Sequence, residues 1–209
     1  MAIDTNEAPP SQFPSNSSQP CHFYIAVDRQ KFKMETFVDL LGVAGKRPSL
    51  PMVVCCSSRD ELDSVCSAVS NLPNISLASL YSDLADAERS LVFDNFRQAT
   101  MRWNQKAPVH LGEDGEVVQE GQKAQMIVVT DTCLPVLSCG EPSISARILI
   151  NYELPLKKET YMRRMATCLA PDGIVINMVV GGEVVTLKTV EESSGLVITE
   201  MPINISEIL

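Results

Sequence analysis

The chain has 209 residues, 45% of them hydrophobic, which is enough for one domain with a sizeable core. Its 17 Lys and Arg stand against 26 Asp and Glu, and the net charge of −9 argues against strong autonomous binding to a nucleic-acid backbone. No apolar run approaches the ~18 residues of a membrane-spanning helix, and the polar, Pro-rich start has no features of a secretory signal.

Residues 1–21 are rich in Pro, Ser, Asn and Gln, and we predict a disordered tail before a domain that spans residues 22–209. Within this domain, short apolar runs alternate with segments of helical periodicity. The predicted strands are 22–27, 52–56, 75–80, 126–129, 147–151, 174–180 and an edge strand at 197–199. The predicted helices are 34–41, 58–72, 83–96, 156–168 and 183–192, with a linker at 42–51. This alternation predicts an α/β fold with a mostly parallel sheet flanked by helices.

Local signals predict where three of the helices begin or end. Ser58 precedes Glu61 by three residues, which is the spacing of a capping box. Asp83 stands where it can cap the third helix, and Pro171 and Gly173 are predicted to end the fourth.

Residues 101–124 interrupt the alternation, and we predict a surface insert there. The stretch mixes Pro and Gly with a run of acids and contains Trp103, the only Trp of the chain. Exposed aromatic residues often anchor interfaces, so Trp103 is a candidate for contact with a protein partner. The alternative is that Trp103 ends the preceding helix and packs on the core.

The cysteines and histidines give little support for metal, disulfide or nucleophile chemistry. Seven cysteines include no CxxC pair and lie partly inside apolar runs, which indicates buried thiols in a reduced, intracellular protein of the cytoplasm or nucleus. His22 and His110 lack the sequence context of a hydrolase triad. We therefore expect no metal and no cofactor.

Six segments follow one another in a recognisable order. They read FYIAVDRQKFKMETFVDLL, PMVVCCSSRDELDSV, LYSDLADAERSLVFDNFR, MIVVTD, ARILINYELPLKKETYMRR and GLVITEMPINISEIL. In this order and at this spacing they resemble the second RecA-like lobe of the DEAD-box RNA helicases, and most of all the initiation-factor 4A group. The resemblance covers about 23–209 and implies a RecA-like three-layer sandwich, the C-terminal lobe of a helicase in the P-loop NTPase superfamily.

The residues that this family uses on ATP are missing at the matching positions. No GxxxxGK[ST] phosphate loop is present, and GVAGK at 42–46 has its glycines too close together. In motif VI, Arg164 matches the first arginine, whereas Thr167 and Ala170 stand where the resemblance places the two arginines that reach the γ-phosphate. In motif V, Ser138 replaces the aspartate that helps to hold the ribose. Because loss of an arginine finger typically costs ~10³–10⁵ in rate, we expect no catalytic residue and no enzyme activity.

The RNA-facing positions of the family are retained better. The resemblance matches Thr130 to the motif V threonine and Arg89 to the arginine of Q-x-x-R, both of which contact RNA phosphates. Arg163 and Arg164 add a basic cluster on the predicted helix before Pro171. The plainer alternatives are that Arg89 pairs with Asp86 or Glu88 on a helix surface, and that the basic cluster is only a solvated helix end.

Three functions are compatible with this sequence. The first is a catalytically inactive helicase lobe that binds a protein partner in RNA processing or translation. The second is a weak RNA-binding protein. The third is a helicase subunit that is completed in trans by a first RecA-like lobe on another chain.

Overall fold

The computed structural model describes residues 19–106, 123–205 and 208. Its seven-stranded sheet has the order β3-β4-β2-β5-β6-β1-β7, with parallel pairing throughout. The strands are β1 (Cys21–Val27), β2 (Pro51–Cys56), β3 (Ile75–Leu80), β4 (Ala124–Thr130), β5 (Ala146–Asn151), β6 (Leu169–Val180) and β7 (Ile198–Glu200). The helices are η1 (Gln30–Phe32), α1 (Lys33–Ala44), α2 (Arg59–Val69), α3 (Asp86–Lys106), η2 (Asp131–Cys133), η3 (Leu137–Cys139), α4 (Lys158–Cys168) and α5 (Val184–Ser194).

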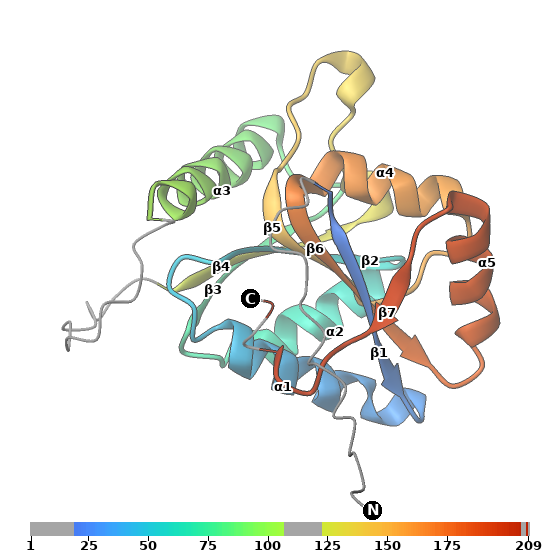
Figure 1. The fold of residues 1–209 in the computed structure, drawn as a ribbon. Coiled ribbons are helices and arrows are strands. Elements are labelled where there is room, and N and C mark those ends of the chain that lie inside the picture. The colour runs from blue at the N-terminus through green and yellow to red at the C-terminus, as the bar shows by residue number, and fades with distance from the viewer. Residues whose placement is uncertain (1–18, 107–122, 206–207, 209) are drawn as a thin grey trace, which may run out of the picture.

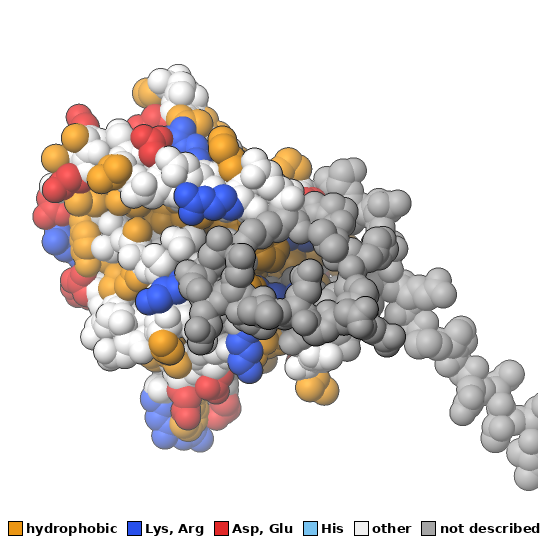
Figure 2. Space-filling view, turned by 90° about the vertical axis from the view of Figure 1, so that its left-hand side faces the viewer, with side chains coloured by type: hydrophobic (Ala, Val, Ile, Leu, Met, Phe, Trp, Pro, Cys, Tyr) orange, Lys and Arg blue, Asp and Glu red, His pale blue; other side chains and the backbone are white. Residues whose placement is uncertain are grey.

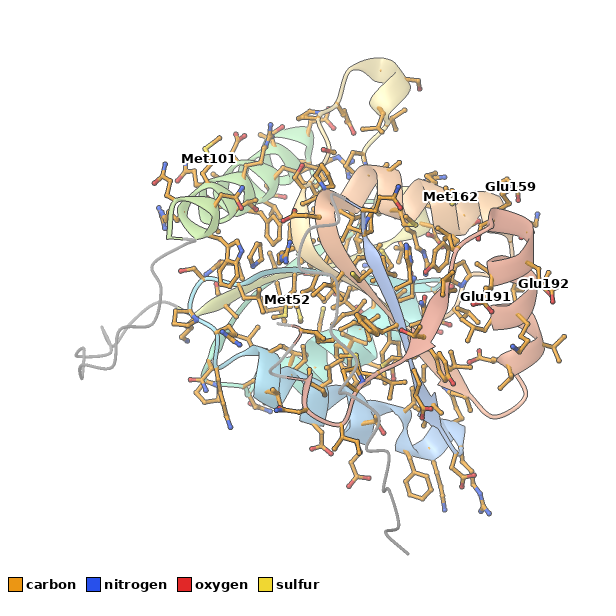
Figure 3. The ribbon with its side chains drawn as sticks, in the orientation of Figure 1. Met52, Met101, Glu159, Met162, Glu191 and Glu192 are labelled. Atoms are coloured by element: carbon orange, nitrogen blue, oxygen red, sulfur yellow. The ribbon has the colours of Figure 1, made fainter. Side chains whose placement is uncertain are left out.

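The sheet is the middle of three layers. Helices α1 and α2 cover one face, and α3, α4 and α5 lie on the other (Figure 1). Successive residues of a strand point to opposite faces, so Cys56 packs with α1 and α2 while Cys55 packs with α4. Met52 lies among the side chains of the core, whereas Met101 projects outward from α3 (Figure 3). Burial on both faces explains why the central strands are continuous apolar runs.

The predicted strands are confirmed, and β3 matches its predicted bounds. The predicted edge strand is β7, which pairs only with β1 among the described strands. The capping box is present as well, because the backbone N–H of Glu61 donates to Oγ of Ser58 at 3.3 Å. The predicted tail lies outside the described residues up to residue 18, and β1 starts one residue earlier than the predicted strand, at Cys21.

Two helix boundaries and the role of two residues after α4 were predicted wrongly. The predicted linker at 42–51 starts too early, because α1 continues through Gly42 to Ala44. Asp83 does not cap α3, which begins at Asp86; its carboxylate instead pairs with Arg59. The fourth helix ends at Cys168, as predicted, but Pro171 and Gly173 do not end it. They lie inside β6, where the register with β5 shifts between the pairs Ala146–Leu169 and Ile148–Ile174. An irregular stretch of a strand tolerates a residue without an N–H, so proline is compatible with this place.

The predicted insert also begins too early. Residues 101–106 belong to α3, and β4 begins at Ala124, which is fully buried. The helical face continues from Phe96 through Thr100 to Trp103, so the helix carries its packing contacts past the predicted boundary. The rest of the insert lies outside the described residues. Within the described ranges, no helix has both the length and the apolar character needed to cross a membrane.

Candidate functional site

The carboxyl edge of the sheet gathers polar residues from three strands. Ser57 follows β2, Asp131 follows β4, and Glu153 lies two residues beyond β5. The backbone N–H of Ser57 donates to Oε2 of Glu153 at 2.6 Å. Parallel α/β sheets bind their ligands outside the carboxyl ends of the strands, so this edge is the candidate site.

Arg164 of α4 lies at the centre of this edge and has no exposed surface. Its Nε and Nη2 donate to the two carboxylate oxygens of Asp131, both at 2.7 Å. Its Nη1 donates to Oδ1 of Asn151 at 2.9 Å and to the carbonyl of Glu153 at 2.8 Å, and Nη2 also reaches Oγ of Ser57 at 3.4 Å. Burial by itself lowers the pKa of Arg164, but the hydrogen bonds to Asp131 outweigh it, and the pKa is raised. Because a guanidinium has five donors, these bonds leave none for a phosphate.

A buried chain of hydrogen bonds continues from Arg164 across the sheet. Nδ2 of Asn151 donates to Oδ1 of Asn177 at 2.8 Å, and Nδ2 of Asn177 donates to the hydroxyl oxygen of Tyr161 at 3.2 Å. The Tyr161 hydroxyl also lies within hydrogen-bond distance of Nδ1 of His22, at 2.9 Å. Burial lowers the pKa of His22 to about 4, so the imidazole is neutral near pH 7. The polar groups under α4 therefore satisfy one another.

The three positions matched to nucleotide contacts lie in α4, β6 and the short helix η3. Thr167 is buried in α4, where its hydroxyl donates to the carbonyl of Arg163 at 2.8 Å. Ala170 is the second residue of β6, and Ser138 is exposed in η3. None of these side chains carries a positive charge.

Arg89 is directed at the segment that follows β4. Its Nη1 donates to the carbonyl of Cys133 at 2.8 Å, and its Nη2 pairs with Glu141 at 3.3 Å. The guanidinium also lies over the ring of Phe93, 4.8 Å from its centre. The pairing with Asp86 or Glu88 that the sequence suggested is therefore wrong, since the carboxylate partner is Glu141.

Arg163 is exposed on α4 and donates to the backbone carbonyl of Asp131. The three arginines predicted to contact RNA, Arg89, Arg163 and Arg164, thus all bind residues of the segment from Asp131 to Glu141. The structure brings them together around this segment and not around an open groove. RNA contact by these arginines stays a prediction, and it would have to compete with these bonds.

Thr130 is the candidate that lines a hollow open to solvent. The hollow has a volume of about 110 Å³, and its wall includes Ser58, Arg59 and Tyr81. Arg59 begins α2, where the backbone amides and helix dipole favour an anion. Its guanidinium, however, lies 4.8 Å from the centre of the Tyr81 ring and 3.4 Å from the carboxylate of Asp83. This acidic neighbour reduces the attraction for a phosphate.

Trp103 lies in α3 and packs, partly buried, against the core that includes α1 and α2. This is the packing that one of the two sequence alternatives predicted. Contact of the remaining exposed part of Trp103 with a partner stays a prediction.

The sequence interpretation missed the central role of Asp131 and of the two buried asparagines. Asp131 closes the quoted segment MIVVTD, but nothing in the sequence connects it with Arg164. Asn151 and Asn177 are each a polar residue at or inside a strand that is otherwise apolar, and both are buried. An amide in such a strand predicts a buried hydrogen-bond partner, and this signal was available. No group of three potential metal ligands occurs in the part of the chain that the structure describes.

A parallel sheet with two helices on one face, three on the other and its polar residues at the carboxyl edge defines a RecA-like lobe. Solved structures agree. The C-terminal domain of the DEAD-box protein Dbp5 superposes with a TM-score of 0.63 at 16% identity, covering 90% of this chain and 92% of that one. The E. coli DEAD-box protein SrmB, solved bound to regulator of ribonuclease activity A (RraA), gives a TM-score of 0.60 at 16% identity, covering 89% of this chain and 92% of that one. The S. cerevisiae Dbp5 C-terminal domain has also been solved bound to Gle1 and IP6.

Sequence relatives point to the same family. Eukaryotic initiation factor 4A of Cryptosporidium parvum is 23% identical over 189 residues, and the ATP-dependent RNA helicase fal1 of Schizosaccharomyces pombe is 24% identical over 189 residues. Each alignment covers 90% of this chain but only 39% and 40% of the relatives, so the chain spans about two fifths of their length. No family model matches the chain. The chain is thus a homologue of the initiation-factor 4A-like DEAD-box RNA helicases, with the fold of their C-terminal RecA-like lobe.

Proposed function

We propose that this chain is a catalytically inactive DEAD-box lobe that acts as a protein-interaction module in RNA metabolism, in the cytoplasm or nucleus. The observation that carries the proposal is the state of the motif VI segment. Its retained arginine, Arg164, is fully buried with every donor occupied, and the two positions matched to γ-phosphate contacts are Thr167 and Ala170. A developing phosphate charge needs a cation that can reach it, and none of these three side chains provides one.

Two further observations support the interaction role. The net charge of −9, and the bonds of Arg89 and Arg163 to carbonyl groups of this chain, disfavour a phosphate backbone as the main ligand. The comparable lobes of SrmB and Dbp5 have been solved in complexes with RraA and Gle1, so this fold presents surfaces that bind proteins.

The proposal is tested by nucleotide binding and turnover. A ligand that binds only the folded state raises the thermal midpoint, so we expect no shift with Mg²⁺-ATP. In a second assay, the isolated first lobe of an initiation factor 4A is mixed with this chain, with RNA, and ATP turnover is measured. The second lobe of the same initiation factor serves as the positive control. Turnover above that of the first lobe alone would refute the inactive lobe and favour a helicase subunit completed in trans.

Weak RNA binding is the second candidate, and the hollow beside Thr130 is the observation that favours it. Binding of a labelled single-stranded RNA at low ionic strength should be salt-sensitive and should weaken in Arg59→Ala. Arg47→Ala, which changes a basic residue that does not line this hollow, is the matched control. Undetectable binding by the unmodified chain would eliminate this candidate.

A further inference from the structure

Strand β3 is an open edge of the sheet. It pairs only with β4 among the described strands, and it lies on the left of Figure 1, below α3. The N–H of Ala124 donates to the carbonyl of Asn74 at 3.0 Å, so the backbone of Asn74 faces β4. Backbone groups of alternate residues in a strand point to the same side, so the N–H and carbonyl groups of Leu77 and Ser79 face away from β4. No hydrogen bond joins these outward-facing groups to any residue that the structure describes.

This edge is less protected than the opposite one. At the other end of the sheet, β7 has only three residues and ends in the charged Glu200. Strand β3 has six residues, Ile75–Leu80, none of them charged and none of them proline. Proteins usually shorten an edge strand, or place charges, proline or a bulge on it, to prevent pairing with another chain. Because β3 has none of these devices, its outward-facing backbone groups are suited to pairing with an added strand.

A groove beside this edge can take the side chains of an added strand. It lies between α3 and the first halves of β3 and β4, and its volume of about 380 Å³ is within the range of ligand pockets in proteins. Its wall includes the buried side chains of Phe96 in α3 and Ile127 in β4. Ala78 lines the groove as well, so the groove lies on the face of the sheet that α3 covers. Every second side chain of a strand added beside β3 would point to this face.

Among the described residues that line this groove, Arg102 is the only charged one. It is exposed on α3, and none of the described carboxylates forms an ion pair with it. The side of the molecule that carries α3 and β3 faces the viewer in Figure 2. There, Lys and Arg lie in the middle of the visible coloured surface, and Asp and Glu lie toward its margins. The groove therefore favours an acidic side chain over a basic one.

The position of Arg102 determines where the acidic residue must stand. Arg102 follows Phe96 by six residues, which is about 9 Å along the helix axis. Residues two positions apart in a strand point to the same face and lie about 6.6–6.8 Å apart. An apolar side chain against Phe96 and an acidic side chain two residues away therefore match the groove, because the long arginine side chain covers the remaining distance.

We infer that β3 binds an extended segment of a partner protein, which adds a strand to the sheet and places an apolar side chain against Phe96 and an acidic one at Arg102. The open backbone groups select a polypeptide and not a nucleic acid, because an extended polypeptide offers N–H and carbonyl groups at the matching spacing. A second copy of this chain fits less well, because the strand that it would add is β3 itself, which has no acidic residue. The inference rests on the proposed function and gives the contact site and the class of partner.

Amide hydrogen exchange of the full chain tests whether the edge is open. The N–H groups of Leu77 and Ser79 should exchange at least about a hundredfold faster than those of Ala78 and Leu80, which face β4. Equal protection at all four positions would mean that another part of this chain already covers the edge, and it would overturn the inference.

Peptide selection tests the occupant. A library of random nine-residue peptides is selected on the immobilised full chain, and the most enriched peptide is labelled for fluorescence anisotropy. We expect enriched sequences in which an apolar residue stands two positions from Asp or Glu. Ser79→Pro removes an outward-facing N–H but no bond to β4, a change that an edge strand tolerates, and it should weaken binding roughly tenfold. Ser79→Ala keeps this N–H, so it is the matched control and should bind the peptide like the unmodified chain.

Charge reversal tests the acidic contact. Arg102→Glu changes an exposed side chain and should weaken binding about fivefold, and a peptide with lysine in place of its acidic residue should recover the loss in this variant. Arg97→Glu lies on the same helix but outside the groove, and it should bind like the unmodified chain.

Each other outcome overturns the inference. Peptides that bind Ser79→Pro and Arg102→Glu as tightly as the unmodified chain would place the contact elsewhere and leave the proposed function standing. A dimer in analytical ultracentrifugation that Ser79→Pro abolishes would replace the partner by a second copy of the chain. Selection without any enriched peptide would exclude the added strand, whereas the inactivity of the lobe is tested separately by ATP turnover.

Discussion

The pair formed by Arg164 and Asp131 gives a sharp stability prediction. In Asp131→Asn the side chain keeps its size, but the charge that balances the buried guanidinium is lost. The amide also turns one acceptor into an NH₂ group that faces the Arg164 donors, whose bonds to the two carboxylate oxygens are both 2.7 Å long. Arg164 cannot respond by losing its proton.

Breaking a buried ion pair by removing one partner costs about 3–5 kcal/mol. The Asp131 side chain keeps 26% of its surface exposed, so we take the lower end and expect a loss of about 3 kcal/mol in the free energy of unfolding. For a domain of this size, 1 kcal/mol shifts the thermal midpoint by about 2–4 °C, so the midpoint should fall by roughly 6–12 °C. Urea unfolding at pH 7, with the slope compared between variants, measures the loss directly.

Asp83→Asn is the matched control, because its partner Arg59 is 59% exposed and the pair is 3.4 Å apart. An exposed pair contributes at most about 1 kcal/mol. If Asp131→Asn destabilises the protein no more than Asp83→Asn does, the buried pair is not a major source of stability. A double variant, Asp131→Ala/Arg164→Met, should lose less than the sum of its single changes, since removing both charges leaves neither uncompensated.

Three more changes test other parts of the structure. Burial lowers the pKa of His22 from its ordinary value of 6.5 to about 4, so the contribution of the neutral imidazole to stability is complete above pH 6.5 and falls as the pH drops toward 4. The free energy of unfolding should therefore decrease by about 2 kcal/mol between pH 7 and pH 5. Urea unfolding of His22→Asn should not show this decrease. Arg89→Ala should speed amide hydrogen exchange of residues 139 and 140, in the loop between β4 and β5, roughly tenfold, whereas Leu91→Ala should not. Ser58→Ala removes the cap of α2 and should cost about 1 kcal/mol, with Ser90→Ala on the exposed side of α3 as the control.

The positions of the strands along the chain and their alternation with helices were predictable from the sequence because the signal is local, whereas the three-layer arrangement followed from the family resemblance. Each buried strand, such as β2 or β3, is a short apolar run, and the cap at Ser58 depends on a neighbour three residues away. The replacement of the two motif VI arginines by Thr167 and Ala170 could also be predicted from the sequence, since it depends only on alignment with the family. The early start of β6 was not predictable, because Pro171 is compatible with this irregular stretch of strand only through its pairing with β5.

The partners of the charged residues were decided by the tertiary structure alone. Arg164 binds Asp131 from 33 residues away, and Arg89 binds Glu141 from 52 residues away. Residues so far apart in the sequence leave no periodic pattern that would indicate their contact. The carboxylate that a guanidinium binds is selected only in the folded protein, where the packed sheet and helices exclude water around it. The sequence by itself thus determined which kinds of residue the lobe keeps and lacks, and packing determined which partners within the fold Arg89 and Arg164 bind.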